Sequence, residues 1–355
     1  MSASESEPAL ATGAVAVSGL HLLTTSSHKV VMSQKRQSLN AVLYMIPADL
    51  CFDTADWAIE RHPKTIAKYV AEGLPLPPTE LARKHFPNAT FLPPSTTLCP
   101  FAGACRGPCL FESGQAFFVR GYKQALPGEQ VHLGRLRRTL LYFKGGGTVN
   151  RGPGPDFRRL VEKDIARVIR VANDIDYCPS IRLNGTSDLP WESSGIMGAF
   201  PSTCFYDYTK IPHRMEAFLA GRLPKNYHLT FSIGGTHSAQ IPSFLKRGGN
   251  VAICWERKDQ MPSSVRKVVL LDAKHRPVST MDLGARYRVV DGDLDDLRFL
   301  DDRSVIVGLY AKSNTITLDR GAPQRFFVDS RTNPTKARMC GQGVGCGASF
   351  LARPY

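Results

Sequence analysis

The chain has 355 residues, of which 43% are hydrophobic, so it can bury a large core in one or two domains. No uninterrupted apolar run approaches the roughly 20 residues that cross a bilayer, and residues 1–10 lack the basic and apolar pattern of a signal peptide. These features argue against a membrane-spanning or a secreted protein and predict a soluble, cytoplasmic one without a membrane partner.

The formal net charge is +14, an excess that attracts polyanions. Compatible partners are nucleic acid, a nucleotide and a phosphorylated small molecule, and charge spread over solvated faces is the alternative. The sequence does not fix the oligomeric state. Nine cysteines, an odd number in a chain of this size, do not suit a disulfide framework, so metal binding or plain burial are their expected uses.

The first part of the chain is predicted to be irregular. Residues 1–25 are rich in Ala, Ser, Thr and Glu and have no sustained hydrophobic period, which predicts a disordered leader. An apolar strand is predicted over 41–46, and a helix-prone segment follows over 53–71. Prolines then recur, and they predict that 51–98 is an irregular insertion between the strand and the loop that it would otherwise feed.

The chain becomes more regular after residue 155. Apolar residues at helical spacing predict an amphipathic helix over 156–174. The predicted strands, which helical pieces separate, are 180–183, 204–207, 227–232, 250–255, 287–290 and 305–310. This succession favours an α/β fold with a parallel sheet, as a partial or complete (β/α) barrel over residues 26–330. Residues 331–355 then form a tail that contains Cys and Gly.

Three cysteines, Cys99, Cys105 and Cys109, lie within eleven residues of a loop rich in Gly, Pro and Ala. Thiolates at such spacing can converge on one metal centre, and three ligands leave a fourth position open on zinc or on one iron of a cluster. The candidates for a fourth ligand in a closed zinc site are Cys51, a histidine, Cys340 and Cys346. An iron–sulfur cluster, a zinc ion and simple burial of apolar thiols are therefore the three interpretations.

Polar side chains follow the predicted strands, where the mouth of a (β/α) barrel binds its ligands. The candidates for binding a cofactor are Asn184, Ser187, Asp207 and Lys210. The candidates for catalysis are Asp188, Glu192 and His237. Asn, Asp and Ser also cap helices and close turns, so each of those residues has a purely structural alternative.

Other notable residues receive structural interpretations. The cysteines expected in the core, because their neighbours are apolar, are Cys178, Cys204 and Cys254. The acidic stretch 291–302 fails the spacing of a calcium loop, and we expect it to hold a loop through contacts of Asp with the backbone and with Arg298. His228 alternates with apolar strand residues and is a candidate to point into a barrel.

The close cysteines and the succession of strands and helices resemble those of radical S-adenosylmethionine enzymes. The usual spacing in that family is tighter than the five and three intervening residues found here. The resemblance implies a [4Fe–4S] cluster on Cys99, Cys105 and Cys109 whose open iron binds S-adenosylmethionine.

A closer resemblance, over residues 40–320, is to bacteriophage and prophage proteins of the gene product 88 type. The stretches that carry it are Leu43–Ala48, Cys99–Leu110, Arg182–Asp188 with Trp191 and Glu192, and Asp291–Asp301. It implies a phage gene product that acts in the host cytoplasm, and it supplies no reaction. Two hypotheses follow: a radical-type iron–sulfur enzyme with an anionic or nucleotide-like small-molecule substrate, or a non-catalytic zinc- or cluster-stabilised module that binds nucleic acid.

Overall fold

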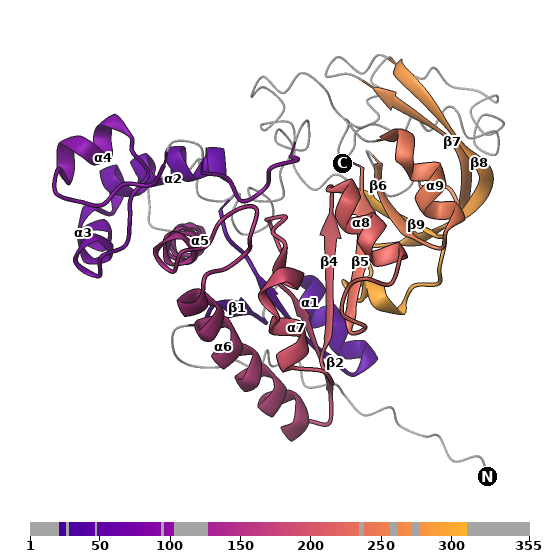
Figure 1. The fold of residues 1–355 in the computed structure, drawn as a ribbon, viewed down its shortest axis with the longest axis horizontal. Coiled ribbons are helices and arrows are strands. Elements are labelled where there is room, and N and C mark those ends of the chain that lie inside the picture. The colour runs from indigo at the N-terminus through magenta and orange to yellow at the C-terminus, as the bar shows by residue number, and fades with distance from the viewer. Residues whose placement is uncertain are drawn as a thin grey trace, which may run out of the picture.

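A mixed nine-stranded sheet organises the computed structural model, which describes residues 21–25, 28–46, 48–93, 96–102, 127–233, 238–255, 261–271 and 277–310 (Figure 1). The strands are β1 (Leu23–Thr24), β2 (Ser38–Leu43), β3 (Cys178–Arg182), β4 (Cys204–Thr209), β5 (Tyr227–Ser232), β6 (Asn250–Trp255), β7 (Ser264–Leu271), β8 (Pro277–Asp291) and β9 (Ile306–Tyr310). Their order in the sheet is β1-β2-β3-β4-β5-β6-β9-β8-β7. Within this order, each strand from β2 through β9 to β8 is parallel to the next. The two edge strands, β1 and β7, are antiparallel to their neighbours.

This architecture confirms the predicted α/β class with a parallel sheet. Among the described residues the two edge strands do not pair with each other, so hydrogen bonding does not close the sheet. The helices are α1 (His28–Ser33), α2 (Ala48–Arg61), α3 (Pro63–Ala71), α4 (Glu80–His85), α5 (Pro127–Lys144), α6 (Pro155–Asp174), α7 (Ile196–Ala199), α8 (Pro212–Leu219) and α9 (Ile241–Lys246). The helix predicted over 156–174 is α6, which begins with a proline in its first turn, where a missing N–H costs no hydrogen bond.

One face of the sheet is apolar and carries the main core. Alternate strand residues point to opposite faces, and the apolar set joins side chains of α6 in one hydrophobic cluster. Its strand members include Leu39, Ala41, Ile181, Phe205, Leu229, Phe231, Val251, Ile253 and Ile306. We call this the helix face. Burial of each large side chain here contributes about 1.5–3 kcal/mol.

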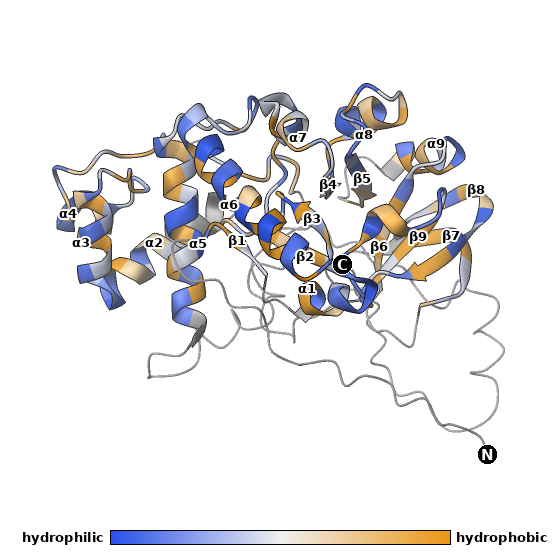
Figure 2. Cartoon of the chain, turned by 90° about the horizontal axis from the view of Figure 1, so that it is seen from below, coloured by the Kyte–Doolittle hydropathy of each residue, from blue (hydrophilic) through white to orange (hydrophobic). Residues whose placement is uncertain are grey.

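The opposite face of the sheet is polar, and α1 lies on the other side of the sheet from α7, α8 and α9 (Figure 2). Its strand residues include Ser38, Asn40, Ser180, Arg182, Tyr206, Tyr208, His228 and Thr230. We call this the polar face. It is covered by α1, whose Lys29 pairs with Asp293, and by the segment 291–301, whose Phe299 packs on Tyr206.

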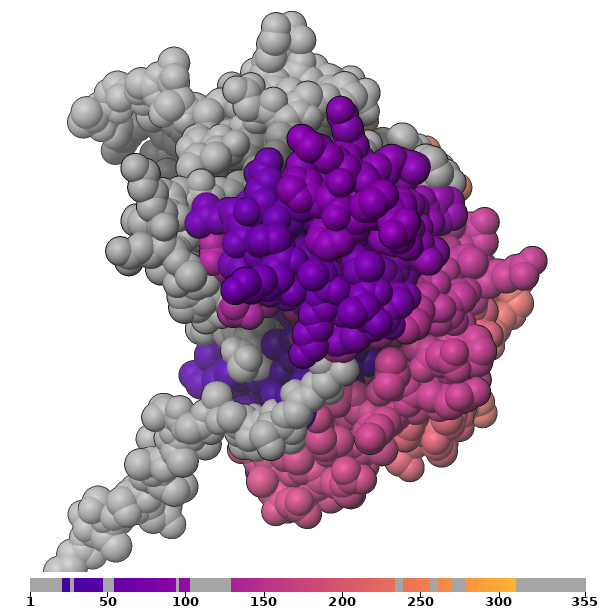
Figure 3. Space-filling view, turned by 90° about the vertical axis from the view of Figure 1, so that its left-hand side faces the viewer, coloured from indigo at the N-terminus to yellow at the C-terminus, as the bar shows by residue number. Residues whose placement is uncertain are grey.

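The insertion between β2 and the cysteine loop is folded. The prediction that 51–98 is irregular was wrong, because α2, α3 and α4 lie there and pack with α5 around a second hydrophobic cluster. The helix-prone segment 53–71 is confirmed as α2 and α3, which meet at Pro63. Pro63 begins a helix instead of breaking one, and Thr79 caps α4 by accepting from Ala82 N. This helical insertion projects from the sheet and faces the viewer in Figure 3.

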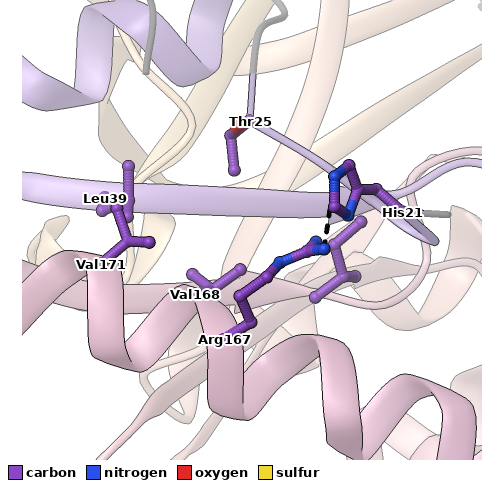
Figure 4. Close-up of a pocket in the computed structure, with 7 residues that line it drawn as sticks. His21, Thr25, Leu39, Arg167, Val168 and Val171 are labelled. Atoms are coloured by element: carbon purple, nitrogen blue, oxygen red, sulfur yellow. Dashed lines mark hydrogen bonds between the residues drawn. The ribbon is translucent and has the colours of Figure 1, made fainter. Parts of the chain in front are cut away.

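The described end of the predicted leader is also ordered. β1 pairs with β2, and Leu22 and Leu23 are buried. Asp164 of α6 accepts from Leu23 N at 2.7 Å, and a small pocket lined by His21 and Arg167 lies between this segment and α6 (Figure 4). The prediction of a disordered leader was therefore wrong for 21–25.

Parts of the predicted organisation lie outside the described residues. These are residues 1–20 of the leader, the end of the domain at 311–330 and the tail at 331–355. No helix in the described part of the chain is both long and apolar enough to cross a bilayer.

Candidate functional site at the carboxyl edge of the sheet

The loop 183–190, which follows β3, lies against the end of β2. Gly185 N donates to Leu43 O at 3.0 Å, and the Thr186 hydroxyl donates to Met45 O. A Cβ atom on Gly185 would lie 2.6 Å from Leu43 O, so only glycine allows this approach of the two backbones. The loop is therefore fixed at the carboxyl edge of the parallel strands.

The first cysteine of the predicted metal loop lies beside this loop. Asp188 N donates to Leu98 O at 2.8 Å, and Leu98 is fully buried in the main core. The next residue, Cys99, is half-buried and begins a turn in which Ala102 N donates to its carbonyl at 3.2 Å. Cys99 therefore lies at the carboxyl edge of the parallel strands.

The other members of the predicted metal site cannot be placed. Cys105, Cys109, Cys340 and Cys346 lie outside the described residues, and so does the side chain of Cys51. Among the described residues, no group of three His, Cys, Asp or Glu side chains has a geometry that could hold a metal ion. The metal ligands stay predictions.

Three of the predicted cofactor-binding residues bond to one another. Asp207 of β4 accepts from Asn184 N at 2.7 Å and from Asn184 Nδ2 at 3.1 Å. Asn184 Oδ1 accepts from the Ser187 hydroxyl at 2.9 Å and from Leu189 N at 2.8 Å. All three predicted residues are buried. This arrangement shapes the loop and ties it to β4.

The two predicted catalytic carboxylates that the structure describes share one buried cation. Arg214 of α8, which is 2% exposed, donates from Nη1 to Asp188 at 2.5 Å. It also donates from Nε and Nη2 to the two oxygens of Glu192, each at 2.7 Å. Such a bidentate pair fixes orientation as well as charge. Tyr227 connects Arg214 to Asp207. Its hydroxyl accepts from Arg214 Nη2 and donates to Asp207, each at 2.8 Å.

The remaining oxygen of Asp188 is also occupied. Oδ2 accepts from Lys210 N at 2.7 Å, and Oδ1 accepts from the Thr209 hydroxyl at 2.9 Å besides Arg214. Lys210 therefore enters the site through its backbone N–H. With both oxygens engaged, Asp188 has the geometry of a positioning residue, and its catalytic role and that of Glu192 stay predictions. His237 lies outside the described residues.

Burial sets the electrostatics of this network. It raises the pKa of Asp207 to about 6, against the lowering effect of Arg214 and the Asn184 N–H. Burial alone would lower the pKa of Arg214, but Tyr227, Asp188 and Glu192 around it raise that pKa well above its ordinary value. The guanidinium is therefore permanently charged and holds its two carboxylates in place.

The polar face contains a second buried network that the sequence analysis did not identify. Asp296 accepts from Arg182 at 3.2 Å and lies 3.6 Å from Lys29 Nζ, which is 2.8 Å from Asp293. Burial alone would raise the pKa of Asp296, but Lys29 and Arg182 lower it below its ordinary value. The guanidinium of Arg182 also stacks on the Tyr208 ring at 4.7 Å. Polar residues at every second strand position were the available signal.

Several atoms of the polar face have unused hydrogen-bonding capacity. The hydroxyls of Tyr208 and Thr230 and the Nε2 atom of His228 are buried without a hydrogen-bond partner among the described residues. Burial, followed by the charge of Arg298, lowers the pKa of His228 to about 4. His228 is therefore neutral near pH 7.

The acidic segment 291–302 holds its loop through the predicted contacts of Asp with Arg298 and with the backbone. Arg298 donates to Asp295 at 3.0 Å and lies 3.1 Å from Asp301, and Asp295 also accepts from Leu297 N at 2.9 Å.

The predicted core position of Cys178 was wrong. Cys178 is exposed, because it begins β3 at the rim of the sheet. Cys204 and Cys254 are half-buried, and burial raises the pKa of the Cys204 thiol to about 12.

Fold and site together define an α/β protein with Cys99 and a buried ion network at the carboxyl edge of its parallel strands. The chain belongs to the Gene product 88 family, whose family model matches residues 58–330. This match confirms the phage-type family that the sequence motifs indicate. No curated protein and no solved structure matches the chain. The resemblance to radical S-adenosylmethionine enzymes stays a prediction.

Proposed function

We propose that the protein is a phage-encoded iron–sulfur enzyme of the radical S-adenosylmethionine type, acting in the host cytoplasm on an anionic or nucleotide-like small molecule. The observation that carries this proposal is the position of Cys99. It lies at the carboxyl edge, where Leu98 is bonded to the loop after β3, and it follows the first parallel strand along the chain. A cluster in that place would face the strand ends of the sheet.

The order of the strands supports the finer proposal of a partial (β/α) barrel. β2, β3, β4, β5, β6 and β9 are neighbours in the order of the sequence. Because parallel crossovers are right-handed, an unreversed order places the connecting helices on one face. That leaves the other face to line an interior, and here it is the polar one.

The residues fit the proposed cofactor in kind. Three cysteine thiolates, Cys99, Cys105 and Cys109, would leave one iron of a [4Fe–4S] cluster open. When bound, the cluster supplies the electron that breaks a C–S bond of S-adenosylmethionine. The chain's own contribution is to hold the loop 183–190 rigid beside Cys99, through Asn184, Asp207 and Arg214.

The test begins with anaerobic purification and measurement of iron and sulfide. We expect about four of each per chain, and release of 5′-deoxyadenosine and methionine when dithionite and S-adenosylmethionine are added. Cys99→Ala, Cys105→Ala and Cys109→Ala should each lose the iron. Cys178→Ala is the matched control, because that thiol is exposed at the start of β3, and it should keep the iron.

A colourless protein with one zinc per chain would overturn the proposal. It would favour the alternative of a non-catalytic, zinc-stabilised module. Iron that is retained in all three loop variants would also overturn it, because the cluster would then have other ligands.

A further inference from the structure

Basic side chains gather at the amino edge of the sheet, at the opposite ends of the strands from Cys99. They lie in the loops before β5, β6 and β9, at the carboxyl end of α9, and in the part of β8 that precedes its pairing with β9. These amino-edge cations are Arg222, Lys225, Lys246, Arg247, Arg286, Arg288 and Arg303, and all are exposed. Hydrophilic segments beside α8 and α9 are blue in Figure 2.

The sheet topology brings these residues together from separate parts of the sequence. β5, β6, β9 and β8 are consecutive neighbours, so at a strand spacing of about 4.8 Å their amino ends span about 15 Å. The segment before β9 is bonded to α9 and β6: the Ser304 hydroxyl donates to Leu245 O at 2.8 Å, and Val305 N donates to Asn250 Oδ1 at 3.1 Å. Arg303 packs over Gly248, where a Cβ atom would lie 3.1 Å from its Nε.

Most of this charge is not neutralised by neighbours. Arg247 pairs with Glu216 and Arg288 with Asp302, and both are exposed pairs of the kind that contribute little. Within the described ranges, Arg222, Lys225, Lys246 and Arg303 form no ion pair. The buried arginines Arg182, Arg214 and Arg298 differ in each having a carboxylate partner.

We propose that the amino edge binds the phosphodiester backbone of nucleic acid. An edge of about 15 Å matches about four phosphates along one strand, at one charge per 3.4 Å of helix axis. Exposed Arg and Lys side chains contact phosphates without reading bases, so the binding would be independent of sequence. Because this surface is at the other end of the strands from Cys99, it would hold the protein on nucleic acid and leave the carboxyl edge free.

The test compares two variants that lose the same charge. Arg222→Gln, Lys225→Gln, Lys246→Gln and Arg303→Gln together form the edge variant. The control combines Lys64→Gln, Lys68→Gln, Lys84→Gln and Arg151→Gln, all exposed positions away from this edge. Binding of a fluorescein-labelled 30-nucleotide DNA, single-stranded and duplex, is measured by anisotropy between 50 and 200 mM NaCl.

For the wild type we expect the logarithm of the binding constant to fall with the logarithm of salt with a slope of about −3 to −4. The edge variant should bind at least tenfold more weakly at 50 mM NaCl and lose most of the slope. The control should stay within about threefold and keep it. Unchanged thermal unfolding of both variants would show that they are folded.

Three outcomes would overturn the inference. They are absent or salt-independent binding by the wild type, an equal loss in both variants, and an edge variant that binds like the wild type. Binding to phosphatidylserine vesicles without binding to DNA would overturn it as well. None of these results bears on the iron and sulfide content that tests the proposed function.

Discussion

The two faces of the sheet are held by different physics. On the helix face, apolar side chains such as Phe205 and Ile181 pack without directional requirements. On the polar face, Lys29, Arg182 and Asp296 are buried together, and each charge depends on a specific partner. The apolar face should therefore tolerate small changes of shape, whereas the polar face should not tolerate loss of a single charge.

The largest expected effect is on the polar face. Asp296→Asn keeps the size of the side chain but leaves Lys29 with only Asp293 and removes the ion pair of Arg182. Removing one partner of a buried ion pair costs about 3–5 kcal/mol. Urea unfolding measured at pH 7 should show a loss of this size.

The matched control for that change is Asp302→Asn. Asp302 is 76% exposed and pairs with Arg288 at the surface, so its loss should change the free energy of unfolding by less than about 1 kcal/mol. An Asp296→Asn variant as stable as this control would contradict the idea that the polar face depends on its charges.

An intermediate effect is expected from pH, with opposite signs on the two faces. Burial raises the pKa of Asp207, on the helix face, to about 6 from 3.8, so its stabilising contribution is complete below pH 3.8 and is lost as pH rises through 6. Burial lowers the pKa of His228, on the polar face, to about 4 from 6.5, so its contribution is present above pH 6.5 and is lost as pH falls towards 4. Each of these two contributions to the free energy of unfolding is at most about 3 kcal/mol.

The measurement is the free energy of unfolding between pH 4 and 7. In Asp207→Asn the free energy of unfolding should rise more steeply with pH than in the wild type, because the contribution of Asp207, which falls with pH, is gone. In His228→Gln the free energy of unfolding should rise less steeply with pH, or fall, because the contribution of His228, which grows with pH, is gone. Variants with parallel pH profiles would show that the two groups do not titrate differently in the folded protein.

The smallest effect is expected on the helix face. Ile181→Val removes one methylene from a fully buried strand residue and should cost about 0.5–1.5 kcal/mol, since the surrounding apolar side chains can relax. Calorimetric or urea unfolding would measure it. A cost above 3 kcal/mol would mean that this face is as unforgiving as the polar one.

Local patterns were sufficient for most of the parallel sheet. The strands predicted at 227–232 and 250–255 are confirmed with unchanged bounds, and α6 is confirmed to within a residue, because periodicity reports directly on which side is buried. The insertion was misjudged because proline was taken as a breaker. Between Pro78 and Pro87, however, Thr79 caps the short helix α4, and α4 packs in the second hydrophobic cluster.

The candidate site was predicted only in part, for a different reason. The residues at the ends of β3 and β4 could be located, and the structure brings Asn184, Ser187, Asp188 and Asp207 together. The cation that holds Asp188 and Glu192, Arg214, carries no local signal. It lies in the first turn of α8, where a charged residue is ordinarily solvated, and only the packing of α8 against the sheet buries it.

The chain leaves the sheet near Met45 and comes back at Leu98. The loop 183–190 is bonded to both points, because the Thr186 hydroxyl donates to Met45 O and Asp188 N donates to Leu98 O. The excursion through α2, α3 and α4 therefore departs and returns almost at one spot. A change in the length of this projecting lobe would therefore leave both attachment points, and Cys99 beside the second of them, in place.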